Sequence, residues 1–437
     1  MRRLSLKVIW MSTVNWARTD LLKKKVESVR VCLVTPGHLS TNPRLVKEAD
    51  AMFEAGYQVN VIASRFIPWA DQADREFADR AWQVRKIPFG PAANFFTRSI
   101  QWLSKRVGLL IYKYTGFCAE RAFHPAYPAL QRAACKVPAE MYVAHNLAAL
   151  PAAWRAAQKH GALLGFDAED FHSGELLECP ENSALIQLTR SLEQKYLPLC
   201  DYVSAASEGI AAAYSQAYSI KMPLVINNVF PKVDAPSVRV KYPTSLSPSL
   251  YWFSQTIGPG RGLELVVSSI ALSASRPVLY LRGNASSRYR SELDQLAASM
   301  GVGANVEFLA PESPGAMLKL AASYDIGLAT EVSLVHNRDI CITNKIFTYL
   351  QSGIPVIATN TTGQVDIAQQ VPGAIFVFSR DNPQELANII DDLLLSPGKL
   401  EDARQAAWEV GDTRFNWDQE KLLFLDNVKT VIAAASK

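Results

Sequence analysis

The stretch VRVCLVTPG, residues 29–37, is an apolar run that stops at a Pro-Gly turn. An unbroken apolar run before a glycine-containing turn is typical of a parallel strand that is buried on both faces. Next, Asn42 and Pro43 supply a helix cap and a first-turn proline, and Gly56 ends the helix that follows. A second apolar stretch over residues 57–63 predicts another strand. This strand–helix–strand unit is the repeating element of a doubly wound parallel sheet.

The same unit recurs along the whole chain. In the first half, further strands are predicted over residues 141–144, 163–166, 201–205 and 224–226. The alternation then restarts, and strands are predicted over residues 250–253, 278–281, 305–309, 324–329 and 355–359. The predicted fold class is therefore α/β, with two Rossmann-like doubly wound parallel-sheet domains that face a cleft.

Length and one break in the pattern set the domain boundaries. A chain of 437 residues exceeds a single ordinary core, and after residue 232 prolines and serines replace the periodic pattern. The N-terminal end, cationic with one short apolar run, is interpreted as a floppy or helical extension rather than a targeting segment. We predict an extension over residues 1–27, an N-terminal domain over 28–232, a linker over 233–249, a C-terminal domain over 250–410 and a final helix within 411–437 that crosses back to the N-terminal domain.

Composition limits the kinds of partner. The net charge is +4, and 49% hydrophobic with 20% charged residues describe a globular protein. This mild positive charge suits a small anionic ligand or a membrane surface and is too weak for a nucleic acid. The six cysteines are scattered, with no C-x-x-C pair, so we expect reduced thiols, no zinc site and a cytoplasmic location. No stretch approaches the roughly 20 apolar residues that span a bilayer.

Two anion-binding segments are predicted in the C-terminal domain. In a glycine-rich turn, Gly258 and Gly260 permit close approach of the backbone, and Arg261 adds a charge that can grip phosphate. A second helix begins near Asn344 and Lys345, where its N-terminus offers free N–H groups. Two anion sites in one domain suit a diphosphate. The alternatives are that the turn serves packing alone and that Lys345 is a solvated surface charge.

Acidic residues follow a strand in the N-terminal domain, where residues 167–175 read DAEDFHSGE. Because ligands bind beyond the carboxyl ends of parallel strands, Glu169, Asp170 and His172 are candidate catalytic residues that position hydroxyl groups or shuttle a proton. Metal binding is the weaker choice, because no companion ligand cluster is evident. Helix capping by Asp170, or simple solvation, is the alternative. His145, which also follows a strand, has the same two interpretations.

Between residues 82 and 121, cations alternate with aromatic side chains. This pattern has two interpretations, and both stay open. One is a patch that rests on an anionic membrane, with the aromatic rings at the interface. The other is a set of amphipathic helices whose aromatic rings lie in the core. The cations are Arg85, Lys86, Arg98, Lys105, Arg106, Lys113 and Arg121, and the aromatic residues are Trp82, Phe89, Phe95, Phe96, Trp102, Tyr112 and Phe117.

Together, these segments resemble glycosyltransferases of the GT-B fold, in particular glycosyltransferase family 4. The resemblance covers the chain from about Val29 onward. The segments that carry it stand in the family's order and are Thr35–His38 with Asn42–Val46, His145–Pro151, Ile257–Glu264, and Asn344–Leu350 with Gly353–Val356.

The resemblance implies retaining transfer of a sugar from a nucleoside-diphosphate sugar, held by the C-terminal domain, to an acceptor on the N-terminal domain. It implies no cofactor and no required metal. The residues that it places at the donor are Gly37, Gly258, Gly260, Arg261, Arg282, Asn344 and Lys345. Those that it places at the acceptor are His38, Asn42, Arg44 and His145, while the loop of Glu169, Asp170 and His172 faces the reacting sugar.

The expected role is hexosyl transfer to a glycan or lipid-linked acceptor in cell-envelope or exopolysaccharide synthesis, with peripheral contact to the inner face of an anionic cytoplasmic membrane. Four positions depart from the family pattern. The family usually has two glutamates flanking the donor segment, and the first of them falls near Ile340 in this chain. Thr348 stands where a glutamate usually grips the nucleotide ribose, Gln255 where an arginine is common, and Glu169 where a histidine is often found. These departures leave two alternatives: a catalytically silent sugar- or nucleotide-binding homologue that supports a partner, and a nucleotide-sugar epimerase of the same fold.

Overall fold

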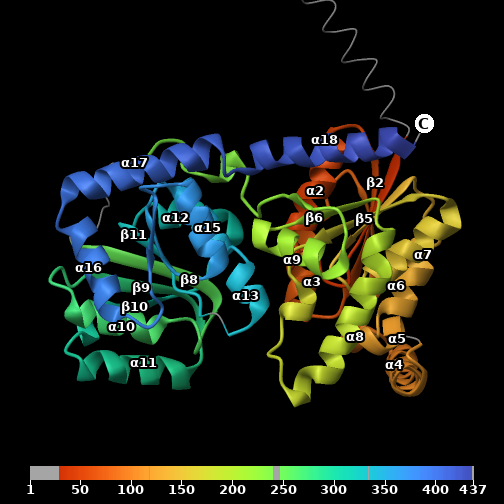
Figure 1. Cartoon of the computed structure of the whole chain (residues 1–437), viewed down its shortest axis with the longest axis horizontal. Helices are drawn as coiled ribbons and strands as arrows, with labels where there is room; N and C mark the ends of the chain where they lie inside the picture. Colours follow the sequence, from red (N-terminus) through yellow and green to blue (C-terminus); the bar gives the residue numbers. More distant parts are fainter. Residues whose placement is uncertain (1–28, 118, 240–246, 333, 436–437) are drawn as a thin grey trace, which may run out of the picture.

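The computed structural model describes residues 29–117, 119–239, 247–332 and 334–435, which form two α/β domains (Figure 1). The predicted extension over residues 1–27 lies outside the described residues, as does the central part of the predicted linker. Each domain is one parallel sheet with helices on both faces. Two long helices, α17 (Pro397–Thr413) and α18 (Trp417–Ala435), run along one side of both domains (Figure 1).

The N-terminal sheet has seven parallel strands in the order β3-β2-β1-β4-β5-β6-β7. Its central strand β1 pairs with both β2 and β4, and the four residues Val31–Val34 are fully buried, as the opening apolar run predicts. The strand order reverses between β1 and β4, which is where ligands bind in such sheets. In chain order, the strands are β1 (Arg30–Val34), β2 (Gln58–Arg65), β3 (Gln83–Pro88), β4 (Met141–His145), β5 (Leu163–Ala168), β6 (Tyr202–Ala205) and β7 (Leu224–Val225).

The C-terminal sheet has six parallel strands in the order β10-β9-β8-β11-β12-β13, so its order reverses between β8 and β11. The two doubly wound parallel sheets confirm the predicted fold class. In chain order, the strands are β8 (Ser249–Ile257), β9 (Val278–Ala285), β10 (Val306–Leu309), β11 (Ile326–Ala329), β12 (Val356–Thr359) and β13 (Ile375–Phe378).

The helices begin where local sequence chemistry favours a start. Asn42 caps α2 because its Oδ1 accepts a hydrogen bond from Leu45 N at 3.0 Å, and Pro43 occupies the first turn. The other long helices are α4 (Phe95–Thr115), α6 (Tyr127–Ala134), α7 (Leu150–His160), α8 (Pro180–Tyr196), α9 (Glu208–Tyr218), α10 (Leu263–Leu272), α11 (Ser287–Ser299), α14 (Asn344–Ser352), α15 (Thr362–Gln370) and α16 (Pro383–Leu394). Short helices are α3 (Pro68–Ala73), α5 (Ala119–Phe123), α12 (Met317–Ala321) and α13 (His336–Ile340). Helix α2 itself spans Pro43–Glu54.

Three strands differ from the prediction. Strand β13 (Ile375–Phe378) is absent from it, although its sequence IFVF is an apolar run. The edge strand β3 is absent from the prediction as well, because its sequence QVRKIP is polar and mostly exposed and lacks the apolar run of a central strand. Strand β8 continues past Phe253 to Ile257 and pairs with β9 as far as Ala285, where a turn is predicted. Gly283 permits this extension, since a Cβ there would lie 2.1 Å from the carbonyl oxygen of Ser254.

Helix α18 leaves the C-terminal domain and packs against α2 of the N-terminal domain. At its start, Trp417 N donates to the carbonyl of Phe230 at 2.8 Å, and the Lys47 ammonium of α2 lies 5.1 Å from the centre of the Trp417 ring. One turn later, Glu420 accepts from the side-chain amide of Asn227 at 2.7 Å. The last helix therefore joins the two domains at the segment where the chain crosses between them.

Substituting Gly165→Ala tests the packing of the N-terminal sheet. A Cβ at residue 165 would lie 2.2 Å from the ring of Tyr202, a buried residue of the neighbouring strand. We expect this overpacking to lower the free energy of unfolding by about 1–3 kcal/mol. Urea denaturation measures the change. Gly398→Ala, in α17 with no atom within 4 Å of the added Cβ, is the control and should be neutral or slightly stabilising. Equal effects of the two variants would contradict the tight strand packing.

Candidate active site

The two domains meet at the loop that follows β5. Asn337, in α13 of the C-terminal domain, accepts a hydrogen bond from Phe171 N at 2.7 Å and donates to Asp170 Oδ1 at 2.7 Å. Ser207 Oγ of the N-terminal domain donates to the carbonyl of Ile340 at 2.9 Å. The carboxyl end of β5, where ligands bind in such sheets, therefore lies directly against the other domain.

Two predicted donor residues converge on one carboxylate. Lys345 Nζ lies 2.5 Å from Glu331 Oε1, and Arg261 Nη1 lies 3.6 Å from Glu331 Oε2. Glu331 stands two residues after β11, and Thr330 Oγ1 donates to the carbonyl of Arg261 at 2.8 Å. We call Arg261, Glu331 and Lys345 the cation cradle. The Arg261 side chain is 28% exposed, so the cradle is open to a ligand.

Helix N-termini add to the positive potential of the cradle. Helix α10 begins after Gly262 and α14 begins after Thr343, and neither cap residue accepts a hydrogen bond from its own helix through a side chain. First-turn N–H groups therefore remain for an anion. Gly262 has φ 72°, and a Cβ there would lie 2.6 Å from Thr330 O, so only glycine fits.

Glu331 is ionised beside its two cations. Burial alone would raise the pKa of this carboxyl, but Lys345 and Arg261 outweigh burial and lower the pKa. One negative charge between two positive charges reduces their mutual repulsion and fixes their positions. The cradle keeps one net positive charge, which favours an anionic ligand.

The other predicted donor residues have varied surroundings. Space for a ligand surrounds Gly258 and Gly260, since an added Cβ at either position would meet no atom within 4 Å, and Asn344 is exposed at the start of α14. Gly37 is half-buried beside Thr41. Arg282 is half-buried, and protein groups already bind its guanidinium, which donates to Tyr251 Oη and to Ala310 O, both at 2.9 Å.

The structure shows the surroundings of Thr348 and Gln255, two of the four departures. Thr348 is buried, and its hydroxyl donates to Asn344 O within its own helix at 3.1 Å, so it supplies no carboxylate for a ribose. Gln255 is exposed in the extended part of β8. A nucleotide would therefore find its charge-based contacts at Arg261 and Lys345 rather than at these two positions.

A buried charge network underlies the site in the N-terminal domain. Arg44 binds Asp167 with two hydrogen bonds of 2.6 and 2.7 Å. His145 Nδ1 lies 3.3 Å from Asp167 Oδ2, and His145 Nε2 lies 3.3 Å from Glu48 Oε2. Ser204 Oγ also donates to Asp167 at 2.6 Å. The four charged side chains are at most 1% exposed.

Mutual attraction keeps this network charged. Burial alone would lower the pKa of His145, but the carboxylates of Glu48 and Asp167 outweigh burial and raise the pKa to about 10. Burial alone would raise the pKa of Asp167, but Arg44 and His145 outweigh burial and hold it well below the ordinary value. Burial and the neighbouring Asp167 raise the pKa of Glu48, so Glu48 is the least firmly ionised member of the network, in which cations and carboxyl groups compensate each other.

The residues predicted at the acceptor have interior partners instead. Arg44 and His145 belong to the buried network. His38 is fully buried, where its Nε2 accepts from the backbone N–H groups of residues 66 and 67 at 2.9 Å and its Nδ1 lies 3.3 Å from Asp74. Asn42 caps α2. Polar side chains near these strand ends thus point into the domain, and they hold its loops in place rather than face a ligand.

Of the three candidate catalytic residues, only Glu169 has a side chain without a close hydrogen-bond partner. Glu169 Oε1 lies 4.0 Å from His145 Nδ1, its side chain is 30% exposed, and burial with the neighbouring Asp167 raises the pKa of Glu169 to about 7. Asp170 is bound by Asn337. The His172 ring is held on both sides, by Leu147 N at 3.3 Å and by Glu175 at 2.6 Å. Glu169 is therefore the candidate that can act on a ligand.

Within the described ranges, two groups of side chains have the spacing of metal ligands. In each group, a cationic side chain of the protein already lies against a carboxylate. One consists of Glu48, His145 and Asp167, into which the Arg44 guanidinium projects. The other consists of His38, Asp71 and Asp74; Lys86 lies 3.2 Å from Asp74. A metal ion would have to compete with these cations.

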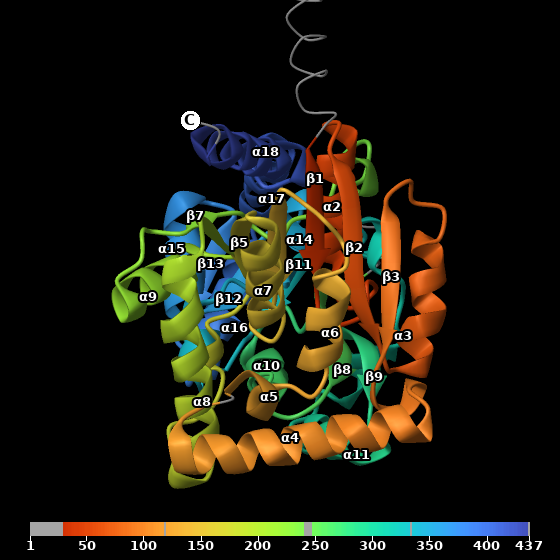
Figure 2. The ribbon, with the colours of Figure 1, turned by 90° about the vertical axis from the view of Figure 1, so that its right-hand side faces the viewer.

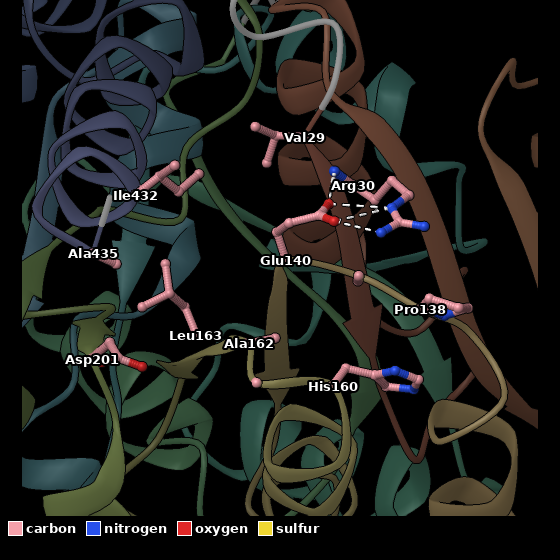
Figure 3. A pocket seen from close by; sticks show the side chains of 12 residues that line it. Val29, Arg30, Pro138, Glu140, His160, Ala162, Leu163, Asp201, Ile432 and Ala435 are labelled. Carbon is pink, nitrogen blue, oxygen red and sulfur yellow. Dashed lines mark hydrogen bonds and ion pairs between the residues drawn. The ribbon is translucent and has the colours of Figure 1, made fainter. Parts of the chain in front are cut away.

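A hollow of about 410 Å³ lies far from the cradle, at the opposite end of the N-terminal sheet (Figure 3). It is lined by Arg30, Glu140, Leu163 and Asp201, which stand at or just before the starts of β1, β4, β5 and β6, and by Ile432 of α18. A second hollow of about 600 Å³ lies beside α18 near β7. Since ligands of parallel sheets bind at the carboxyl ends of the strands, neither hollow is the active site.

Sequence reasoning did not identify Glu331 and Glu48, and it did not recognise Asn337 as a bridge between the domains. A signal existed for Glu48, because it stands four residues after Arg44 on one helix, where opposite charges meet. Glu331 pairs with residues 70 positions before and 14 after it, and no local pattern signals such a contact.

The two doubly wound domains have the fold of the GT-B glycosyltransferases. Residues 248–396 match the family described as "Glycosyl transferases group 1". No curated protein matches the sequence. Residues 248–396 are thus a group 1 glycosyltransferase domain, and the resemblance to the GT-B enzymes is confirmed. The narrower assignment to family 4 stays a prediction.

Solved structures with the same fold span almost the whole chain. HepE of Anabaena, solved in complex with UDP, is 17% identical with a TM-score of 0.66 over 92% of this chain and 100% of that chain. Sucrose-phosphate synthase of Thermosynechococcus elongatus is 13% identical, with a TM-score of 0.66 over 93% and 100%. The lipopolysaccharide outer core galactosyltransferase WaaB is 11% identical, with a TM-score of 0.61 over 92% and 99%. At these identities the likeness concerns the fold.

The buried network predicts a pH effect on stability. Since the folded protein raises the pKa of His145 to about 10, the stabilisation from its charge is fully present below the ordinary pKa of about 6.5 and is lost as pH rises through about 10. His145→Gln removes this term, so the difference in melting temperature between wild type and variant should shrink from pH 7 to pH 10. Differential scanning calorimetry measures it. A difference that stays constant over this range would contradict the charged state of His145.

Proposed function

We propose that the protein is a retaining glycosyltransferase that moves a sugar from a nucleoside-diphosphate sugar to an acceptor on the N-terminal domain. The observation that carries this proposal is the cation cradle, in which Arg261 and Lys345 meet at Glu331 beside the start of α10. HepE, which shares the fold, has also been solved with UDP-glucose. A diphosphate matches the charge and the donor geometry of the cradle.

The cradle would stabilise the leaving group. As the bond between the anomeric carbon and the phosphate oxygen breaks, negative charge grows on the diphosphate, and fixed donors at that position lower the barrier. Arg261, Lys345 and the first-turn amides of α10 and α14 supply this charge in our proposal, without a required metal ion. The acceptor oxygen forms its bond to the anomeric carbon on the face that the diphosphate leaves.

Glu169 would handle the proton of the acceptor hydroxyl. The new carbon–oxygen bond requires this proton to leave, and a carboxylate whose pKa is raised to about 7 is suited to accept it near neutral pH. Asn337 donates a hydrogen bond to Asp170 and accepts one from Phe171 N, and these bonds keep the loop of Glu169 against the donor domain. This contact would bring the two reactants into one geometry.

The acceptor in this proposal is a glycan or a lipid-linked glycan of the cell envelope or of an exported polysaccharide. WaaB, one of the structures with the same fold, acts on the outer core of lipopolysaccharide. The enzyme would work in the cytoplasm, at the inner face of the cytoplasmic membrane, and its net charge of +4 suits contact with anionic lipid.

Arg261→Ala tests the donor assignment. Loss of one fixed donor should cost about 2–4 kcal/mol of barrier, a loss of roughly 30- to 1,000-fold in transfer rate. A thermal-shift screen of nucleoside diphosphates and their sugars first identifies the donor by its stabilising effect, and release of the nucleoside diphosphate then measures the rate. Arg288→Ala, on the exposed face of α11, is the matched control and should keep full activity. Full turnover by Arg261→Ala would show that the donor binds elsewhere.

Glu169→Gln tests the proton step. Wild-type kcat/KM should rise with pH through about 7 as Glu169 ionises, and this limb should be missing in the variant. A pH–rate profile between pH 5 and pH 9 measures it, and Glu178→Gln, an exposed carboxyl of the same segment, serves as control. An unchanged limb in Glu169→Gln would assign the ionisation to another group.

A further inference from the structure

Helix α4 exposes its apolar side chains to solvent. Figure 2 shows it along the lower edge of the N-terminal domain, with no element on its outer side. Phe96, Leu103 and Leu110 are 76%, 56% and 57% exposed. At 100° per residue these three share one face, together with further exposed side chains. Those side chains are Ile100, Val107, Ile111 and Tyr114.

The face of α4 that packs on the domain is small and polar, which reverses the usual pattern of a surface helix. Gln101 binds the backbone of residues 88 and 90, and Tyr112 Oη donates to Ser191 at 3.3 Å. Gly108 is buried, and a Cβ there would lie 2.8 Å from Arg121 Cβ of the adjoining helix α5. An apolar face turned outward on a well-packed helix marks a contact with another apolar phase.

Every ionisable side chain of α4, tyrosines apart, is a cation. Arg98, Lys105, Arg106 and Lys113 lie on the helix, and its sequence contains no Asp or Glu. At 100° per residue, Arg106 and Lys113 lie on one flank of the apolar face, whereas Arg98 and Lys105 lie nearer to the face that packs on the domain. Arg106 lies 4.8 Å from the centre of the Trp102 ring, so aromatic and cationic groups stand side by side, as in helices that lie at a lipid surface.

We propose that α4 docks the N-terminal domain on an anionic lipid bilayer, with its axis in the plane of the interface. The apolar face would enter the boundary of headgroups and acyl chains, while the cations bind lipid phosphates. None of the helices in the described ranges is long and apolar enough to cross a membrane. The charge of α4 favours an anionic bilayer over a second copy of the chain, whose α4 carries the same positive charge. This inference specifies the membrane contact of the proposed function and does not depend on sugar transfer.

Vesicle co-sedimentation of the full chain tests the docking. Wild type should bind phosphatidylcholine vesicles that contain phosphatidylglycerol, and binding should weaken in high salt and on pure phosphatidylcholine. Together, Phe96→Ser, Leu103→Ser and Leu110→Ser should abolish binding. Neutralising Arg106 and Lys113 to Gln should weaken it by about fivefold per cation. The matched control changes three comparably exposed leucines elsewhere, Leu177, Leu422 and Leu423, to Ser and should bind like wild type.

Further measurements separate docking from folding and from catalysis. The α4 variants should keep the wild-type melting temperature and the wild-type affinity for a nucleoside diphosphate, because the substituted side chains are exposed and belong to neither the core nor the cradle. Wild-type vesicle binding by the triple serine variant of α4 would overturn the proposal. So would a dimer in light scattering that the α4 substitutions dissociate, since the apolar face would then belong to a second copy. Loss of vesicle binding with intact sugar transfer in solution would support α4 docking without bearing on the chemistry.

Discussion

Glu331 holds two positive charges at one place, and the proposed donor site depends on this attraction. Arg261 and Lys345 come from segments separated by more than 80 residues, and side by side they would repel. The carboxylate between them makes both positions favourable before any ligand arrives, so a bound diphosphate need not pay to assemble its own site. The N-termini of α10 and α14 add to this attraction for an anion. Their first-turn backbone amides carry positive potential, and the side chain of neither cap residue binds them. The cradle is therefore preorganised for an anion.

Compensated buried charge plays a different role in the N-terminal domain. Ion pairs of Arg44 and His145 with Glu48 and Asp167 tie α2 to the carboxyl ends of β4 and β5. Each of these four side chains therefore has a fixed position. Removing one partner would leave an unpaired charge in the interior, which is costly. Glu169 is the first residue after β5, whose carboxyl end this network holds in place. Between the domains, the amide of Asn337 joins the loop of Glu169 to the segment that also carries Glu331 and Lys345. Chemistry at the domain boundary thus has rigid support on both sides.

Local patterns predicted the fold well and the site only in part. The apolar run at β1, the cap at Asn42 and the final helix from Trp417 follow from neighbours in sequence, and the structure has them as predicted. The edge strand β3 is solvated and so lacks the apolar signal. The glycines and the two helix starts predicted that Arg261 and Lys345 serve one ligand. Their shared partner Glu331 is a tertiary contact, which no local pattern predicts. Residues such as His38 and Arg44 stand near strand ends as expected. Periodicity did not reveal that they point inward, because burial of a polar group depends on a distant partner.

In our proposal, a pyrophosphate binds at the cradle of Arg261, Glu331 and Lys345. A crystal structure with a nucleoside diphosphate tests it most directly. Because the phosphates carry more negative charge than Glu331, we expect them to draw the side chains of Arg261 and Lys345 toward themselves, with a phosphate oxygen at hydrogen-bond distance from each cation. A diphosphate bound elsewhere, with Lys345 still 2.5 Å from Glu331 and no phosphate near Arg261, would contradict the account.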